Sequence, residues 1–74
     1  MKDWDDLRVF MAAARSGSLA SAALRLHMDA TTVGRRIQRL EASLKSTLLV
    51  RSSRGLQLTA AGARLREAGL SVEA

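Results

Sequence analysis

Hydrophobic residues near the start of the chain follow the period of an amphipathic helix. Spaced at i, i+3, i+4 and i+7, they are Leu7, Phe10, Met11 and Ala14. Asp3 and Asp6 are placed as in a capping box at the start of this helix, and Gly17 provides a left-handed stop after it. The pattern predicts a helix from about Trp4 to Ser16, with Trp4, Phe10 and Met11 in the core.

Two more helical patterns follow. Ser18 can cap a helix that ends near Leu26, with an apolar face of Leu19, Ala22, Ala23 and Leu26. Asp29 can cap a third helix that runs to about Leu44, with an apolar face of Val33, Ile37, Leu40 and Leu44. His27 lies in the turn between these two helices, where we expect a surface or capping residue.

After the third helix the pattern changes to that of short strands. Residues 48–50 and 56–58 are β-compatible runs, and the polar segment 51–55 between them carries Arg51 and Arg54. The pattern predicts a two-stranded hairpin with a basic tip. The hairpin must lean on the helices, because a lone hairpin is marginal in water.

A last helix is predicted from Ala60, with Thr59 as its N-cap. Its apolar positions, spaced four, three and four residues apart, are Ala61, Leu65, Ala68 and Val72. A seam of this kind is typical of a helix that pairs with a partner helix. The chain reaches Ala74 without a stop signal, so we expect it to be part of a longer protein.

The composition narrows the possible chemistry. The chain has 74 residues, no cysteine and one histidine, which excludes disulfides, thiolate zinc sites and any metal site that needs two histidines. The longest apolar run, residues 9–14, is too short to cross a bilayer, and the acidic start is unlike a secretory signal. We expect a mainly α, cytoplasmic domain that is not an enzyme, holds no cofactor and has no membrane partner.

The positive charge is concentrated in one block. Residues 35–54 carry six basic side chains and one acidic side chain, whereas residues 1–34 and 55–74 are each neutral overall. Such a block favours a polyanionic partner, with nucleic acid as the first candidate. An ordinary solvated charged face is the alternative interpretation.

The wheel of the third helix separates an aliphatic face from a polar one. On the polar face and its flanks lie Thr31, Thr32, Arg35, Gln38 and Arg39, while Arg36 is nearer the core edge. Arginine can form two hydrogen bonds to guanine and glutamine two to adenine, whereas an arginine at the edge fits a phosphate strand. Two helices joined by a tight turn, the second one basic, therefore suggest a helix-turn-helix that reads DNA.

Three further positions are candidates for DNA contact. Ser18 stands at a helix N-terminus, whose exposed amides bind phosphate well. Arg51 and Arg54 on the hairpin suit a narrow minor groove, which would make the hairpin a wing. Gly34, inside the third helix, either allows close approach to DNA or is tolerated at an exposed position.

Taken in order, the residues resemble the N-terminal domain of LysR-type transcriptional regulators. The resemblance rests on Leu7-x-x-Phe10, Gly17-Ser18, Ala22-Ala23, Leu26, Val33, Ile37, Leu40-Glu41, Leu44, Leu48-Leu49-x-Arg51 and Leu58-Thr59-x-x-Gly62. It implies a winged helix-turn-helix over residues 1–58, with the helix-turn-helix at about 18–44 and the wing at about 48–58. The implied architecture is a three-helix core, a two-stranded wing and, over residues 59–74, the start of a linker helix for dimerisation.

The resemblance also implies a function and partners. In this family the third helix lies in the major groove of double-stranded DNA and the wing at the minor groove, so sequence-specific binding in a bacterial regulator is expected. The full-length protein would be a homodimer or higher homo-oligomer. A small-molecule effector would bind only through a further domain, which is absent from this chain.

The chain departs from the family pattern at two places. The recognition helix often opens Ser-Gln-Pro-Ala-Val-Ser in the family, and here Ala30 and Gly34 replace the Gln and Ser that commonly contact DNA. Arg35 matches the family's base-contacting arginine. Lys45 stands where the family usually has glycine, so it must adopt a left-handed conformation or the helix must end differently.

Two functions of other classes are alternatives to DNA binding. A winged helix could instead bind an acidic protein through its seam and its basic face, but the arginines clustered on helix and wing favour DNA. The salt dependence of binding separates the two, because phosphate contacts release many counterions. An enzymatic domain has no support, because no acid, base and nucleophile converge.

Overall fold

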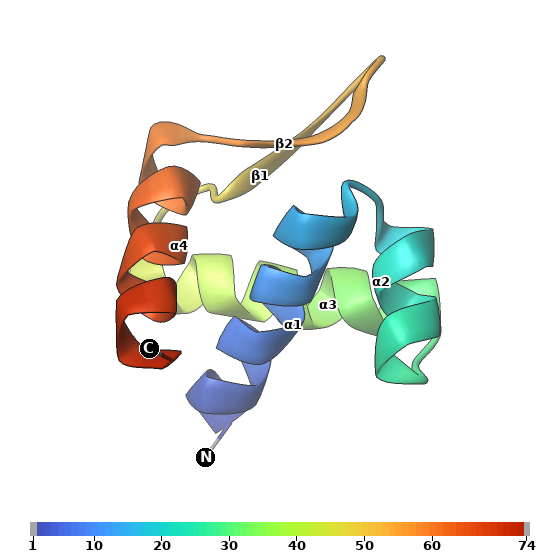
Figure 1. Cartoon of the computed structure of the whole chain (residues 1–74), viewed down its shortest axis with the longest axis horizontal. Coiled ribbons are helices and arrows are strands. Elements are labelled where there is room, and N and C mark those ends of the chain that lie inside the picture. The colour runs from blue at the N-terminus through green and yellow to red at the C-terminus, as the bar shows by residue number, and fades with distance from the viewer. Residues whose placement is uncertain (1, 74) are drawn as a thin grey trace.

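A computed structural model describes the backbone of residues 2–73 and the side chains of residues 4–69. In chain order, the elements are α1 (Lys2–Ser16), α2 (Leu19–Leu26), α3 (Ala30–Leu44), β1 (Leu49–Ser52), β2 (Gly55–Leu58) and α4 (Ala60–Glu73). The predicted fold class, a three-helix core with a two-stranded wing and a fourth helix, is confirmed. Figure 1 shows α1 crossing α3, α2 beside one end of α3 and α4 at the other, with the hairpin above the helices.

The core forms where α1 packs against both α2 and α3. Its buried hydrophobic residues are Val9, Phe10, Met11, Ala13, Ala22, Ala23, Val33, Ile37, Leu40 and Leu48. The predicted apolar faces of α2 and α3 therefore point inward as expected. On α1 the buried face is shifted from the predicted one, because Val9 and Ala13 are fully buried while Leu7 and Ala14 are only half-buried.

Three predictions about the helix faces and starts are wrong. Trp4 is not a core residue, since its side chain is 52% exposed, and Leu44 at the end of the α3 stripe is 47% exposed. In both cases the helical period continues to a helix end, where the described elements cover only part of the side chain. The capping box fails as well, because Asp3 already lies inside α1 and Asp6 is fully buried.

The ends of α2 and α3 combine expected and unexpected chemistry. Ser18 caps α2 as predicted, its hydroxyl accepting a hydrogen bond from the Ser21 amide at 3.1 Å. Asp29 occupies the predicted N-cap position of α3 but makes no side-chain capping bond. His27 and Lys45 end α2 and α3 in the left-handed region, with φ of 56° and 54°, so both take the place usually given to glycine.

The hairpin is antiparallel, with Leu49 opposite Leu58 and Ser52 opposite Gly55. Thr59 caps α4 as predicted, accepting a hydrogen bond from the Gly62 amide at 3.0 Å, while its own amide donates to the Leu48 carbonyl. A Cβ at Gly62 would lie 2.1 Å from that carbonyl oxygen, so only glycine fits. The base of the hairpin is thereby fastened to α4, which provides the support that an isolated hairpin lacks.

Candidate nucleic-acid interface

An open groove runs between α3 and the hairpin. Its lining residues are Leu19, Ala30, Thr31, Gly34, Arg35, Gln38 and Arg51. A second hollow shares part of this lining and extends it over the α1–α2 turn to Ser18 and across to Ser52 and Ser53 of the hairpin. None of the described residues that line either hollow is acidic, so the groove presents arginines, hydroxyls and an amide.

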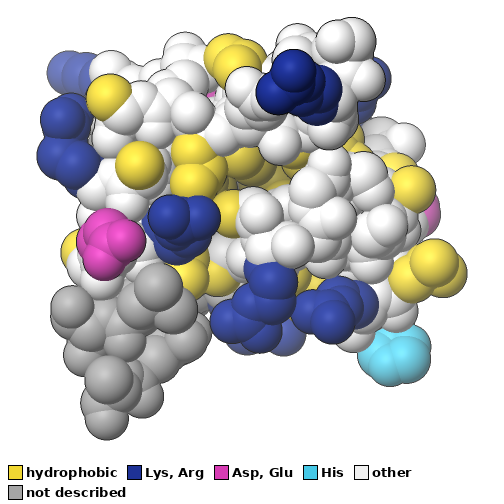
Figure 2. Space-filling model, turned by 45° about the horizontal axis from the view of Figure 1, so that its top comes forward, with side chains coloured by type: hydrophobic (Ala, Val, Ile, Leu, Met, Phe, Trp, Pro, Cys, Tyr) yellow, Lys and Arg dark blue, Asp and Glu magenta, His cyan; other side chains and the backbone are white. Residues whose placement is uncertain are grey.

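Five of the predicted contact residues line these two adjoining hollows: Thr31, Arg35, Gln38 and Arg51 line the groove, and Ser18 lines the second hollow. They come from three separate segments of the chain, namely the start of α2, the polar face of α3 and strand β1. Figure 2 shows basic side chains around a hollow with a hydrophobic floor, and few acidic side chains on the same face. The arrangement joins donors that can reach base edges with cations that attract phosphates.

Gly34 lines the groove on α3, where the domain has room for a larger side chain. A Cβ at this position would lie 3.5 Å from Cδ1 of Leu19, which is an ordinary packing distance. An alanine would therefore fit inside the domain, so packing tolerates the half-buried glycine without requiring it, and close approach to DNA at this position stays a prediction.

The hairpin is held over the groove by contact with the α1–α2 turn. The Leu56 amide donates a hydrogen bond of 3.0 Å to the Gly17 carbonyl. Gly55 has φ of +100°, and a Cβ there would lie 2.7 Å from the same carbonyl oxygen. Because this contact needs glycine at position 55, the sequence sets the distance between the hairpin and the start of α2.

The turn at the tip of the hairpin contains fewer residues than predicted. Arg51 and Ser52 belong to β1, so the turn itself consists of Ser53 and Arg54. Ser52 braces the turn, since its hydroxyl donates to the Gly55 carbonyl and accepts from the Arg54 amide. The two arginines therefore do not flank the turn together: Arg54 is exposed at the tip, whereas Arg51 lies opposite Leu56 and lines the groove.

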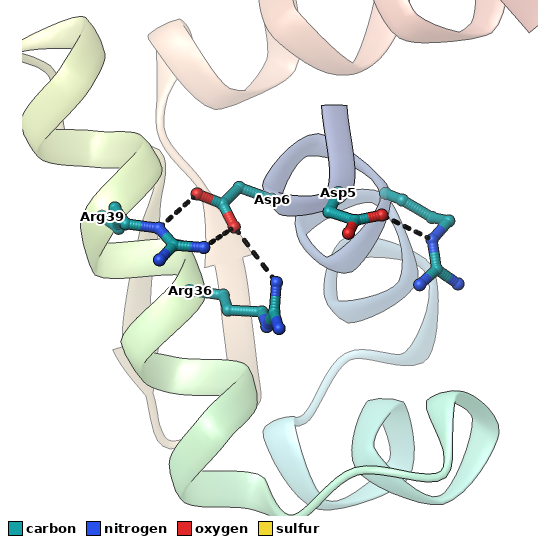
Figure 3. A network of polar contacts seen from close by, with 5 residues as sticks. Asp5, Asp6, Arg36 and Arg39 are labelled. Atoms are coloured by element: carbon teal, nitrogen blue, oxygen red, sulfur yellow. Dashed lines mark hydrogen bonds and ion pairs between the residues drawn. The ribbon is translucent and has the colours of Figure 1, made fainter. Parts of the chain in front are cut away.

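The other flank of α3 faces α1 and is organised around one carboxylate. Arg39 donates two hydrogen bonds to Asp6, from Nε to Oδ2 at 2.8 Å and from Nη2 to Oδ1 at 2.7 Å. Arg36 approaches the same carboxylate, with Nη1 3.7 Å from Oδ1 (Figure 3). The hydrogen bonds from Arg39 and the charges of both arginines hold the pKa of Asp6 below its usual value, although burial opposes this shift.

Thr32 also lies outside the groove. Its hydroxyl donates a hydrogen bond of 2.7 Å to Oδ2 of Asp29 at the start of α3. This bond uses the one proton that the hydroxyl could give to a phosphate. Of the candidate contacts on α3, the structure thus places Thr31, Arg35 and Gln38 at the groove and Thr32, Arg36 and Arg39 away from its lining.

The family model of bacterial regulatory helix-turn-helix proteins of the lysR family matches residues 4–63. The chain belongs to the lysR family. The HTH-type transcriptional regulator TcbR of Pseudomonas sp. (strain P51) is 47% identical over 60 residues, which make up 81% of this chain and 20% of TcbR. The LysR-type chain thus spans about a fifth of the length of this curated relative.

Solved structures match the LysR-type chain over most of its length. The CbnR DBD–DNA complex is 42% identical with a TM-score of 0.86, over 93% of this chain and 79% of the other. The BenM DBD/catB site 1 DNA complex is 31% identical with a TM-score of 0.86, over 92% of this chain and 73% of the other. The whole architecture, wing included, is therefore shared with these two domains.

Part of the predicted pairing seam on α4 packs against the core of this LysR-type domain. Ala61 and Leu65 are half-buried and pack against the core, whereas Ala68 is exposed. The side chain of Val72 lies outside the described residues. Gly69 sits against α1, where an added Cβ would lie 3.1 Å from Sδ of Met11. A role of these positions in dimerisation stays a prediction.

The sequence analysis does not predict the roles of two residues that organise the site. Glu41 accepts hydrogen bonds from the amides of Leu48 at 2.8 Å and Leu49 at 3.3 Å, and so fixes the start of the wing on α3. Asp6 shares the i, i+3, i+4, i+7 spacing of Val9, Phe10 and Ala13, all fully buried. An acidic residue among the most buried positions of α1 needs a partner on another helix. This spacing was the signal by which Asp6 could have been recognised.

No three His, Asp or Glu side chains among the described residues gather as a metal site would require. No described helix is long and apolar enough to span a bilayer.

Proposed function

We propose that this chain is the domain through which a bacterial LysR-type regulator binds double-stranded DNA with sequence specificity. In this proposal α3 enters the major groove and the β1–β2 wing lies at the minor groove. The groove between them carries the proposal, since Thr31, Arg35 and Gln38 of α3 line it together with Arg51 of β1. Glu41, the acid of the adjoining hollow, is engaged by the amides of Leu48 and Leu49. The DNA complexes of CbnR and BenM, which share the fold, support it.

The proposed roles follow from the positions of the side chains. Arg35 and Gln38 read base edges, with Thr31 beside them at the start of α3. Ser18 and the exposed amides of the α2 N-terminus bind phosphate. Arg51 bridges the wing and α3 along the phosphate strand, and Arg54 at the exposed tip reaches the minor groove.

We further propose the domain organisation and partners of the full-length protein. Residues 1–58 form the DNA-binding unit and residues 59–74 begin a linker helix through which copies associate as a homodimer or higher oligomer. The seam of that linker consists of Ala61, Leu65, Ala68 and Val72. A small-molecule effector binds only outside this chain, and the protein acts in the cytoplasm as a regulator and not as an enzyme.

Selection from a pool of random duplexes tests this function. The 74-residue chain is incubated with the pool, and the retained DNA is recovered and sequenced. We expect a short common motif and an affinity that falls steeply with salt, because phosphate contacts release counterions. If no motif emerges and the salt dependence is shallow, the alternative of an acidic protein partner is favoured.

A further inference from the structure

The three arginines of α3 are not equally available to DNA. Arg35 lines the groove, whereas Arg36 and Arg39 turn toward α1 and converge on Asp6 (Figure 3). The charge count of the sequence treats all three as one basic surface. In the folded domain two of these charges lie against a carboxylate that comes from outside the basic block.

The geometry makes this cluster difficult to open. The Asp6 side chain is 1% exposed, and Arg39 meets both of its oxygens with one edge of its guanidinium. If Arg39 left for a phosphate, the buried carboxylate would keep, among the described side chains, the longer contact with Arg36 at 3.7 Å. A buried charge without a close partner is strongly unfavourable, so Arg39 stays with Asp6 although 52% of its side chain is exposed.

Resting on the proposed DNA binding, we propose that Asp6 is a specificity-determining residue. By holding Arg36 and Arg39 on the α1 side of α3, it reduces the attraction of this helix for phosphates of any sequence. Base reading is then left to Arg35, Gln38 and Thr31 in the groove. Asp6 acts on DNA recognition through the two arginines and does not itself touch DNA.

The effect on specificity follows from the difference between the two kinds of complex. Phosphate contacts carry no sequence information. On random DNA the helix can shift until flexible arginines find phosphates, whereas on the selected site base contacts fix its position. Arginines released from Asp6 would therefore strengthen binding to random DNA more than binding to the selected site.

Asp6→Asn in the 74-residue chain is the main test, because it removes the charge with little change of shape. Asp5→Asn is the matched control: it makes the same change in net charge one residue away, at an exposed carboxylate 3.8 Å from Arg8. The measurement is the slope of log affinity against log salt on a random duplex. We expect Asp6→Asn to steepen this slope by about one unit for each arginine released, and to lower the ratio of selected to random affinity.

The control and a double variant decide whether the arginines cause the change. Asp5→Asn is expected to leave the slope at its wild-type value. Asp6→Asn/Arg39→Gln removes both ends of the pair and is expected to recover about one unit of the slope. If folded Asp6→Asn gives the same slope as Asp5→Asn, the proposal is overturned.

A measurement on the wild-type chain avoids any loss of folding in the variants. In NMR spectra, the Nε–H signal of Arg39 should keep its shift when DNA is added, while signals of Arg35 move. A large shift of the Arg39 signal toward that of a phosphate-bound arginine would overturn the proposal. A wild-type chain that binds no duplex at all would instead refute the proposed function, so the two failures are distinguishable.

Discussion

At the scale of single residues, Lys45 stores a small strain at the end of α3. It adopts φ of 54° and ψ of 39°, a region in which the Cβ of an L-residue is crowded at a cost of about 1 kcal/mol. The amide hydrogen bonds that close the helix, from Lys45 and Ser46 to carbonyls of the last turn, need only the backbone. Glycine at this position would keep them without the strain.

We expect Lys45→Gly to raise the free energy of unfolding by about 1 kcal/mol, measured by urea denaturation. Ser43→Gly is the matched control, because Ser43 is exposed inside α3, where glycine costs about 0.5–1 kcal/mol relative to alanine. The two glycines should thus act in opposite directions. If both glycine variants lost stability, the expected strain at Lys45 would be contradicted.

Asp6 links stability to pH. Its pKa in the folded chain lies below the unfolded value of about 3.9, so the stability that it contributes is complete above that value and is lost as the pH falls through the folded pKa. The difference in unfolding free energy between wild type and Asp6→Asn should be constant near neutral pH and shrink below about pH 4. Denaturation at a series of pH values measures it, and a difference that grows in acid would show the opposite sign of the shift.

At the scale of elements, the wing is attached to the rest of the domain at two places. Its base is fixed by Glu41 and α4, and its middle by the bond from Leu56 to Gly17. Only the turn with Arg54 extends beyond these contacts (Figure 1). A change at Arg54 should therefore alter DNA binding without altering the fold.

We expect Arg54→Ala to lower affinity for all duplexes and to reduce the salt slope by about one unit, because one phosphate-proximal charge is lost. Arg54→Lys keeps the charge and should keep the slope, while losing the preference of arginine for a narrow minor groove. Titrations at several salt concentrations measure both effects. An unchanged slope in Arg54→Ala would mean that the wing tip does not reach DNA.

The elements themselves could be predicted from the sequence because each core helix buries one face at helical period. Ser18 and Thr59 were identifiable as caps, since their chemistry is local. The predictions that failed depended on residues far away in the sequence. Trp4 and Leu44 continue the apolar pattern to helix ends where much of each side chain stays exposed, and Asp6 needs a partner 33 residues along the chain.

The groove shows the same limit. Its residue types were predicted, because Thr31, Arg35 and Gln38 share the polar face of α3. The wheel could not show that Arg36 and Arg39 belong to another cluster, because their partner lies on α1. Nor could it place Arg51, whose position follows from the strand register and the contact of the wing with the α1–α2 turn.

At the scale of the whole molecule, the proposed pairing of two copies depends on how much of α4 is left exposed. Ala61 and Leu65 pack on the domain's own core, which leaves Ala68 as the exposed seam position among the described side chains. A helix of this length is marginal as a pairing surface, even apart from its two glycines. We therefore expect the 74-residue chain to associate weakly through α4.

Sedimentation over a dilution series measures this association. The expected result is a monomer at low concentration with pairing only at the highest concentrations, and a Leu65→Ala variant should lose core stability rather than pairing alone. A dimer that persists at nanomolar concentration would show that another surface mediates it.

The central claim is that the groove face of α3 reads base sequence, and Arg35 tests it most directly. Arg35→Ala should cost about 1–3 kcal/mol on the selected site and relax the preference at one base pair. Arg64→Ala is the control, because it removes the same charge from an exposed position on α4 outside the groove lining. Binding of both variants is measured on the selected duplex and on a scrambled one. A loss for Arg35→Ala confined mainly to the selected duplex is predicted, whereas an equal loss on both would contradict base reading by Arg35.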